Sequence, residues 1–201
     1  MREFMIIAAL GALLIADARA KSPWLDAADI QQRLAAGQVV VRSALDGRAR
    51  AAHVDAAVMV HTSPDAVWAV LKDCDHAPSF IPGLKRCQRL ASAADGSWEV
   101  IAHDVKYSWF MPTIHSVFRA DYQRPSRIDF RRVGGDLRDE QGSWLLEPLP
   151  DGSGTIVEYQ VEINPGFWIP QAVVHRSLRK ELPEALAALR IRVESLQAAR
   201  R

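Results

Sequence analysis

The sequence predicts an α+β fold in which a curved antiparallel sheet of about seven strands wraps around a long C-terminal helix. Two observations predict it. Residues 83–163 form a succession of β-rich segments separated by short turns, and residues 170–199 carry apolar side chains every three or four positions. Short connections join antiparallel neighbours, and the apolar face of a sheet needs another element to cover it. We expect an apolar ligand cavity between the sheet and the helix.

The first 20 residues have the three parts of a secretory signal peptide. Arg2 precedes an apolar run over residues 4–16, and Ala-Arg-Ala at 18–20 is a small-residue cleavage site. The run is shorter than the roughly 20 apolar residues that a transmembrane helix needs. We therefore expect cleavage after Ala20 and export to the periplasm, with an uncleaved N-terminal anchor as the alternative.

The rest of the chain divides into an N-terminal extension at 21–52, a main domain at 53–197 and a tail at 198–201. In the extension, Ile30 and Leu34 share one face at helical spacing, which predicts a helix over 24–36. The β-branched residues at 38–45 predict a strand.

The main domain begins with a strand and a helix. Apolar residues alternate over 53–60, as in a strand with one buried face. Pro64 occupies the first turn of a helix that ends near Asp73, and a turn or short helical piece is expected at 77–80. Turn residues such as Asp95-Gly96 separate the β-rich segments that follow. These six predicted strands are 84–92, 97–107, 114–122, 127–133, 142–149 and 155–163.

The C-terminal stretch has one apolar stripe. Its members are Val174, Leu178, Leu182, Ala185, Leu189, Val193 and Leu196. Their spacing predicts a single amphipathic helix over 170–199. Pro183 lies inside this helix and lacks the N–H that bonds to the fourth residue back, so we expect a kink there.

Two cysteines, Cys74 and Cys87, lie 13 positions apart. In an exported protein they can form a disulfide. Two separate buried thiols, or a metal site that also uses His76, are the alternatives, although the spacing fits no usual zinc pattern. We expect no metal and no cofactor, because the chain has no H-E-x-x-H motif, phosphate-binding loop or dinucleotide fingerprint.

Four motifs of the main domain resemble those of a known family. They are Pro64–Leu71, Phe80-Ile81-Pro82-Gly83, Gly142-Ser143-Trp144 and Pro165–Pro170. Over residues 53–197 the chain resembles the polyketide cyclase/dehydrase and coenzyme Q-binding family of the START-like (SRPBCC) superfamily. This resemblance implies a helix-grip fold with a deep cavity. It does not identify a ligand, because the superfamily includes lipid carriers, cyclases and hydrolases.

Aromatic and apolar residues mark the candidate ligand site. Those in segments between elements would form the rim of the cavity: Phe80, Ile81, Pro82, Tyr107, Trp109, Phe110, Phe167 and Trp168. Those on predicted strands would line its interior: Phe118, Trp144 and Tyr159. For each residue taken alone, ordinary core packing is the alternative.

Candidates for acid–base chemistry are few. His103 and His115 lie on predicted strands, and together with Tyr159 they are the candidate catalytic residues. A solvent-facing position is the alternative for each histidine. Gly152-Ser153-Gly154 lies in a turn and lacks the strand-to-helix context of a nucleophile elbow.

The formal net charge of +1 argues against binding nucleic acid through a broad electrostatic field. We expect an exported protein that sequesters or transfers a hydrophobic small molecule, such as a lipid, an isoprenoid quinone or an aromatic compound. Basic residues at 175–180, near Phe167 and Trp168, indicate transient membrane contact, with a solvated helix face as the alternative. A cyclase/aromatase-type enzyme and an envelope protein-interaction module are the alternative functions.

Overall fold

The computed structural model describes residues 24, 26–46, 51–106, 111–169 and 171–200. The strands are β1 (Val40–Asp46), β2 (Ala51–Val60), β3 (Leu84–Ser92), β4 (Trp98–Val105), β5 (Ile114–Gln123), β6 (Arg127–Gly135), β7 (Asp139–Pro148) and β8 (Thr155–Asn164). The helices are α1 (Ala28–Ala35), α2 (Pro64–Leu71), α3 (Ala77–Phe80), α4 (Gln171–Arg176), the π-helical segment η2 (Ser177–Glu181) and α5 (Leu182–Ala198). None of the described helices is long and apolar enough to cross a membrane.

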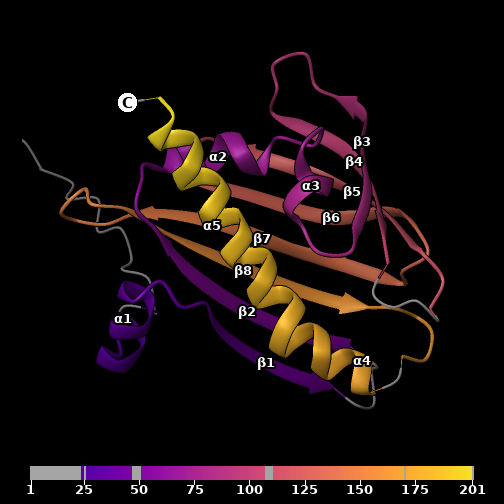
Figure 1. Ribbon diagram of the computed structural model, residues 1–201. Coiled ribbons are helices and arrows are strands. Elements are labelled where there is room, and N and C mark those ends of the chain that lie inside the picture. Colours follow the sequence, from indigo (N-terminus) through magenta and orange to yellow (C-terminus); the bar gives the residue numbers. More distant parts are fainter. Residues whose placement is uncertain (1–23, 25, 47–50, 107–110, 170, 201) are drawn as a thin grey trace, which may run out of the picture.

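All eight strands form one antiparallel sheet in the order β1-β2-β8-β7-β6-β5-β4-β3 (Figure 1). The α+β fold with a curved sheet and a C-terminal helix is therefore confirmed. The strand beyond the expected seven is β1, which belongs to the N-terminal extension. It pairs with β2 at the edge of the sheet, with Val41 opposite Ala56, so the extension continues the sheet of the main domain.

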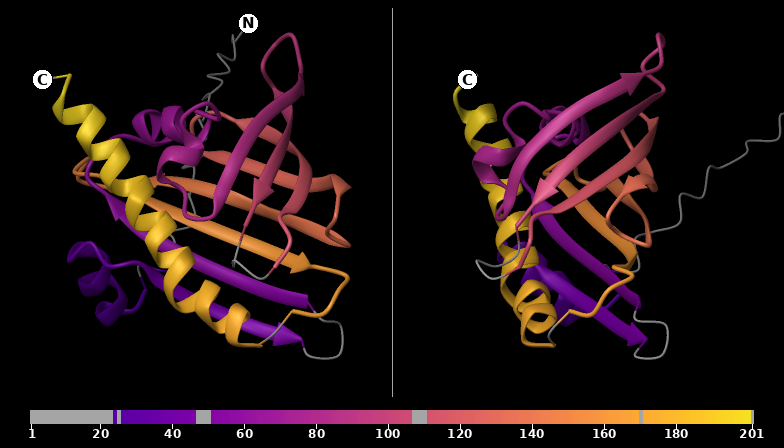
Figure 2. Two further views of the ribbon diagram at one scale, coloured as in Figure 1. Left: turned by 45° about the vertical axis from the view of Figure 1, so that its right-hand side comes forward. Right: turned by 90° about the vertical axis from the view of Figure 1, so that its right-hand side faces the viewer.

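The concave face of the sheet holds the main hydrophobic core. The helix formed by α4, η2 and α5 runs diagonally across this face, and the sheet curves away behind it (Figures 1 and 2). Strand alternation directs Val58, Val60 and Val157 toward the helix, where their side chains are fully buried. On α5, Leu189 and Val193 of the predicted apolar stripe enter the same core.

The outer face is covered at one end by α1. Trp24 and Leu34 pack there against Ala57 and Ile156, which point away from the main core because they alternate with its members. The Arg42 guanidinium lies 4.1 Å from the centre of the Trp24 ring, a favourable cation–π distance. The extension thus adds a second, smaller core on the outer face.

The C-terminal helix changes its hydrogen-bond pattern next to Pro183, where the sequence predicts a kink. Pro183 is in the first turn of α5, and the five residues before this helix form η2, in which Leu182 N–H bonds to Ser177 O. Proline cannot donate a hydrogen bond, and its ring crowds the carbonyl of the fourth residue back. The wider π turn relieves both problems within a continuous helix.

A disulfide joins Cys74 to Cys87, whose Cα atoms are 5.4 Å apart. Cys74 follows α2, and Cys87 lies on the edge strand β3. The bond therefore ties the short helical region around α3 to the edge of the sheet. The alternatives of two free thiols and a Cys–His metal site do not occur here.

Candidate functional site

Five ring side chains form a continuous series across the concave face. The ring centres of His103 and Phe118 are 4.9 Å apart, those of Phe118 and Phe130 5.9 Å, those of Phe130 and Tyr159 6.1 Å, and those of Tyr159 and Trp144 4.4 Å. These separations lie in the range in which aromatic rings attract each other. The rings come from strands β4 to β8 and make an aromatic wall, which we call the ring series.

Gly142 makes room for the ring series at its centre. It lies opposite Phe130 on one side and Val161 on the other. A Cβ atom at this position would lie 2.6 Å from Cζ of Phe130 and 2.1 Å from the backbone oxygen of Gln160. Any larger residue would therefore displace the Phe130 ring or separate the strands.

The ring series is only partly covered by the helix. The side chains of His103, Phe118, Trp144 and Tyr159 keep part of their surface accessible, whereas Val58 and the other valines beneath α5 are fully buried. Accessible aromatic surface on a face that is otherwise core offers contact area to an apolar molecule.

A polar cluster lies at one end of the ring series. Ser116 is opposite His103 on the neighbouring strand, and its hydroxyl donates a hydrogen bond to the carboxyl group of Glu140. Arg132 is opposite Phe118, and its Nη2 donates to the backbone oxygen of Gly135 at 2.9 Å. Nε of Arg132 is buried and has no hydrogen-bond partner among the described residues.

Burial shifts both titratable side chains of this polar cluster toward their neutral forms. It raises the pKa of Glu140 above the usual carboxyl value, although the Ser116 hydroxyl and the charge of Arg132 oppose the shift. It lowers the pKa of His103 to about 4, against a smaller opposing effect of Asp104. A neutral imidazole and a weakly acidic carboxyl group therefore share one end of the concave face.

A second buried carboxylate, Glu99, lies on the same face near α2. Tyr122 donates a hydrogen bond to it at 2.8 Å, and Lys72 and Arg89 form ion pairs with it at 3.2 and 3.3 Å. Burial alone would raise the pKa of Glu99, but the bonds from Tyr122 and Lys72 and the nearby charges outweigh it and lower that pKa. Since both carboxylate oxygens of Glu99 have partners within the protein, we assign Glu99 a structural role.

The residues selected from sequence have different positions. The concave face holds four of the candidates on strands: Phe118, Trp144, Tyr159 and His103. His115 lies on the outer face, with its Nδ1 2.7 Å from an oxygen of Asp104. His115 is thus outside the polar cluster.

The predicted rim residues also differ. Phe80 packs against the main core, Ile81 is half-buried and Pro82 is exposed. Phe167 is half-buried, and Trp168 is 72% exposed. Tyr107, Trp109 and Phe110 lie outside the described residues.

Sequence reasoning missed Phe130, Ser116, Arg132 and Glu140. A usable signal was present in strand periodicity. Ile128, Phe130 and Arg132 alternate along one strand, so Arg132 belongs to the apolar face despite its charge. The same rule places Glu140 in line with Gly142 and Trp144. A charged residue in register with an apolar stripe is a candidate site residue.

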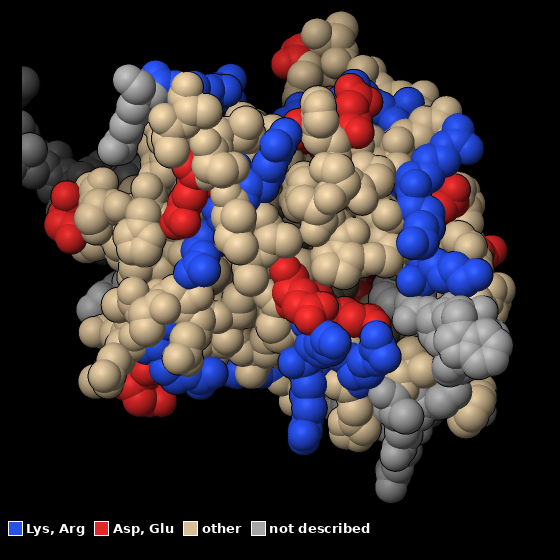
Figure 3. Space-filling view, in the orientation of Figure 1, with Lys and Arg blue, Asp and Glu red and all other residues tan. Residues whose placement is uncertain are grey.

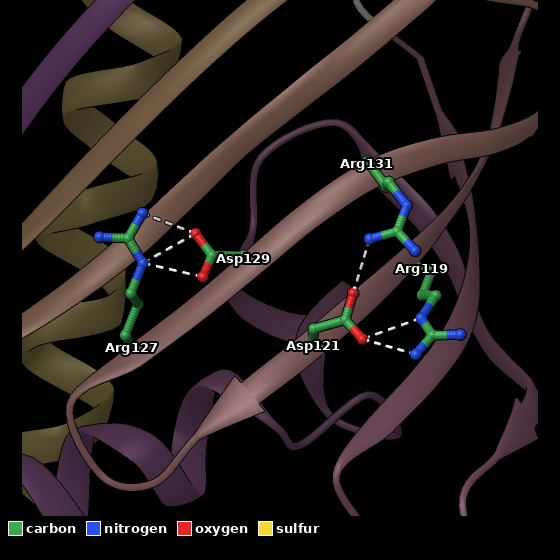
Figure 4. Close-up of polar contacts among 5 residues, drawn as sticks. All are labelled: Arg119, Asp121, Arg127, Asp129 and Arg131. Carbon is green, nitrogen blue, oxygen red and sulfur yellow. Dashed lines mark hydrogen bonds and ion pairs between the residues drawn. The ribbon is translucent and has the colours of Figure 1, made fainter.

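The outer face of the sheet carries a network of ion pairs. Asp121 accepts hydrogen bonds at 2.8 Å from both Arg119 and Arg131, and Arg127 forms a separate pair with Asp129 (Figure 4). A shallow groove of about 420 Å³ crosses this face beside the pairs, lined among others by Arg127, Asp129, Arg131, Gln141, Gln160 and Glu162. Most of the side chains that line this groove are charged or polar, whereas the ring series is mainly aromatic.

No three metal-binding side chains converge anywhere in the described part of the chain. The polar cluster has one histidine and one carboxyl group, and burial favours the neutral form of each. Its chemistry is therefore that of hydrogen bonding and proton transfer.

Comparison with known proteins identifies relatives of the chain. Residues 60–190 match the family model described as polyketide cyclase/dehydrase and lipid transport. No curated protein matches this sequence.

Three solved structures illustrate the similarity of fold. A STAR-related lipid transfer protein fragment from Xanthomonas axonopodis has 18% identity and a TM-score of 0.66, covering 78% of this chain and 94% of its own. Human StAR-related lipid transfer protein 5 has 13% identity and a TM-score of 0.64, with coverages of 80% and 84%. The ZhuI aromatase/cyclase of Streptomyces sp. R1128 has 17% identity and a TM-score of 0.59, with coverages of 72% and 94%. At these identities the likeness shows the fold alone.

The buried position of His103 predicts a pH dependence of stability. Between pH 6.5 and about 4 the unfolded chain binds a proton at this residue that the folded protein excludes. The free energy of unfolding is therefore unaffected by His103 above pH 6.5 and decreases as the pH falls toward 4, because protonation of His103 favours the unfolded chain. When the pH is lowered from 7 to 4.5, the free energy of unfolding measured in urea should fall by about 2 to 3 kcal/mol more in wild type than in H103F. An unchanged difference between the two proteins would show that His103 titrates normally.

Proposed function

The chain belongs to the polyketide cyclase/dehydrase and lipid transport family, and on that premise we propose that it binds a hydrophobic small molecule against the ring series and acts by sequestering or transferring it. The observation that carries this proposal is the partly accessible ring series on the concave face. Lipids, isoprenoid quinones and aromatic compounds all have the flat or extended apolar surface that such a wall accommodates.

The physical basis is burial of apolar area. Each Å² removed from water contributes about 25 cal/mol, and polar groups at one end set the orientation of the ligand. The ring series supplies the apolar contact area, and the polar cluster of Ser116, Arg132, Glu140 and His103 lies at its end. The lipid transfer protein and aromatase/cyclase folds that the chain resembles are consistent with either kind of ligand.

Two tryptophans on opposite faces allow a matched test. Trp144 belongs to the ring series, whereas Trp98 lies on the outer face, 4.5 Å from the Arg119 guanidinium. After incubation with an extract of native membranes, native mass spectrometry should find a bound apolar molecule in wild type and W98A. W144A should bind it about tenfold or more weakly, because a stacked ring is lost. A wild type that stays empty, or equal loss in both variants, would refute the proposal.

We also propose that the protein is exported, with residues 1–20 acting as a cleaved signal peptide. The Cys74–Cys87 disulfide supports this, because disulfides persist in oxidising compartments. The same mass spectra test it: protein from the envelope fraction should begin at Lys21. A full-length chain in that fraction would indicate an uncleaved anchor instead.

Acid–base catalysis on a bound molecule is the second candidate function. Burial shifts the pKa values of His103 and Glu140 in opposite directions, as in acid–base pairs. Ser116, which donates a hydrogen bond to Glu140, lies opposite His103 on the neighbouring strand. If the protein catalyses a cyclisation with loss of water, the molecule recovered from wild type should be one water lighter than that from H103F. Identical molecules from both proteins argue for binding without turnover.

Transient membrane contact is proposed for the segment between β8 and η2. The strongly exposed Trp168 lies in the loop before α4, and tryptophan is favoured at membrane–water interfaces. Lys and Arg side chains gather beside acidic ones over this end of the helix (Figure 3). Arg176 pairs with Glu181 at 3.1 Å, but Arg179 forms no ion pair among the described residues.

Two exposed apolar side chains provide the control for membrane contact. Trp168 and Ile191 are 72% and 60% exposed, but Ile191 lies on α5, away from the loop. Wild type and I191A should bind vesicles containing anionic phosphatidylglycerol, and W168A should bind about tenfold more weakly. Equal binding by all three proteins would exclude the loop as the contact and favour a protein partner for it.

A further inference from the structure

Arg132 carries an unsatisfied hydrogen-bond donor at the end of the ring series. Its guanidinium donates one hydrogen bond to Gly135 O, and its buried Nε–H has no acceptor among the described residues. It forms no ion pair with a described carboxylate, although its charge acts on Glu140. An unpaired cation and an unsatisfied buried donor are both costly, so their presence in a ligand-binding interior requires an explanation.

We propose that Arg132 binds the carboxylate of an apolar ligand, so that the preferred ligands are fatty-acid-like or aromatic carboxylic acids. This inference rests on the proposed function, because it names the chemical class that the ring series would bind. The ligand carboxylate would accept the Nε–H of Arg132, and the apolar body would lie along Phe118 and Phe130 toward Tyr159.

The position of Arg132 supports this assignment. It lies opposite Phe118, two residues after Phe130 on the same strand, so its charge is at the end of the ring series. Guanidinium groups match carboxylates in geometry and charge, and such charge-assisted bonds are about twice as strong as neutral ones.

Glu140 favours the same class of ligand. Burial raises the pKa of this carboxyl group, so less negative charge competes with a ligand carboxylate for Arg132. In its protonated form Glu140 can also donate a hydrogen bond to the ligand, since two nearby carboxyl groups readily share one proton. Ser116 fixes the other side of Glu140 through its hydroxyl.

The test compares an acid with its ester. cis-Parinaric acid and its methyl ester are fluorescent probes with the same apolar chain, and only the acid carries a carboxylate. Wild type should bind the acid about 10- to 100-fold more tightly than the ester. R132Q should bind both probes at the affinity of the ester, and R132K should recover part of the preference because it restores the charge.

Arg131 supplies the control, because it neighbours Arg132 but lies on the outer face, paired with Asp121. R131Q should keep the preference of wild type. Unchanged ester binding by R132Q would show that this variant is folded. Equal affinities of wild type for acid and ester, or a preference that survives in R132Q, would overturn the carboxylate assignment but leave the proposed function intact. Failure of wild type to bind either probe would also overturn the carboxylate assignment, whereas the proposed function would fall only if wild type also stays empty after incubation with the membrane extract.

Discussion

The C-terminal helix, with the short helices α2 and α3 beside it, has to cover the concave face of an eight-stranded sheet, and this geometry limits how much of the face can be sealed. Strands spaced about 4.8 Å apart make such a sheet about 35 Å wide, whereas a helix with its side chains is about 10 Å across. The apolar contacts of Leu189 and Val193 therefore seal one part of the face. The rest of the face carries the ring series, whose large side chains pack against one another and are covered only in part by Leu178 and Leu182 of the helix.

Much of this architecture could be predicted from the sequence, because it follows from short-range patterns. Alternation of apolar residues identified the strands, and the stripe ending at Leu196 identified the helix. The π turn before Pro183 could not be predicted in detail, since proline excludes one hydrogen bond without determining how the helix rearranges. The sequence predicted a strand at 38–45 but not that this strand, β1, pairs with β2 and extends the sheet, because strand partners depend on tertiary contacts.

The site was harder to predict than the fold. Phe118, Trp144 and Tyr159 were recognised as large aromatic residues on strands, but their order across the face depends on register, which the sequence does not state. Arg132 and Glu140 were missed because a charged residue within a strand is usually solvent-facing. Once Phe130 and Trp144 are known to lie on the concave face, strand alternation places Arg132 and Glu140 on the same face. There the two charged side chains form the polar end of the site.

We propose that ligands bind on the concave face, with the carboxylate at Arg132. A crystal structure of the protein with bound cis-parinaric acid tests it most directly. Density for the polyene is predicted along Phe118, Phe130 and Tyr159, with the carboxylate within hydrogen-bond distance of the Arg132 guanidinium. Density in the outer groove beside Arg127, or a concave face closed by side chains with the probe elsewhere, would rule out binding at Arg132.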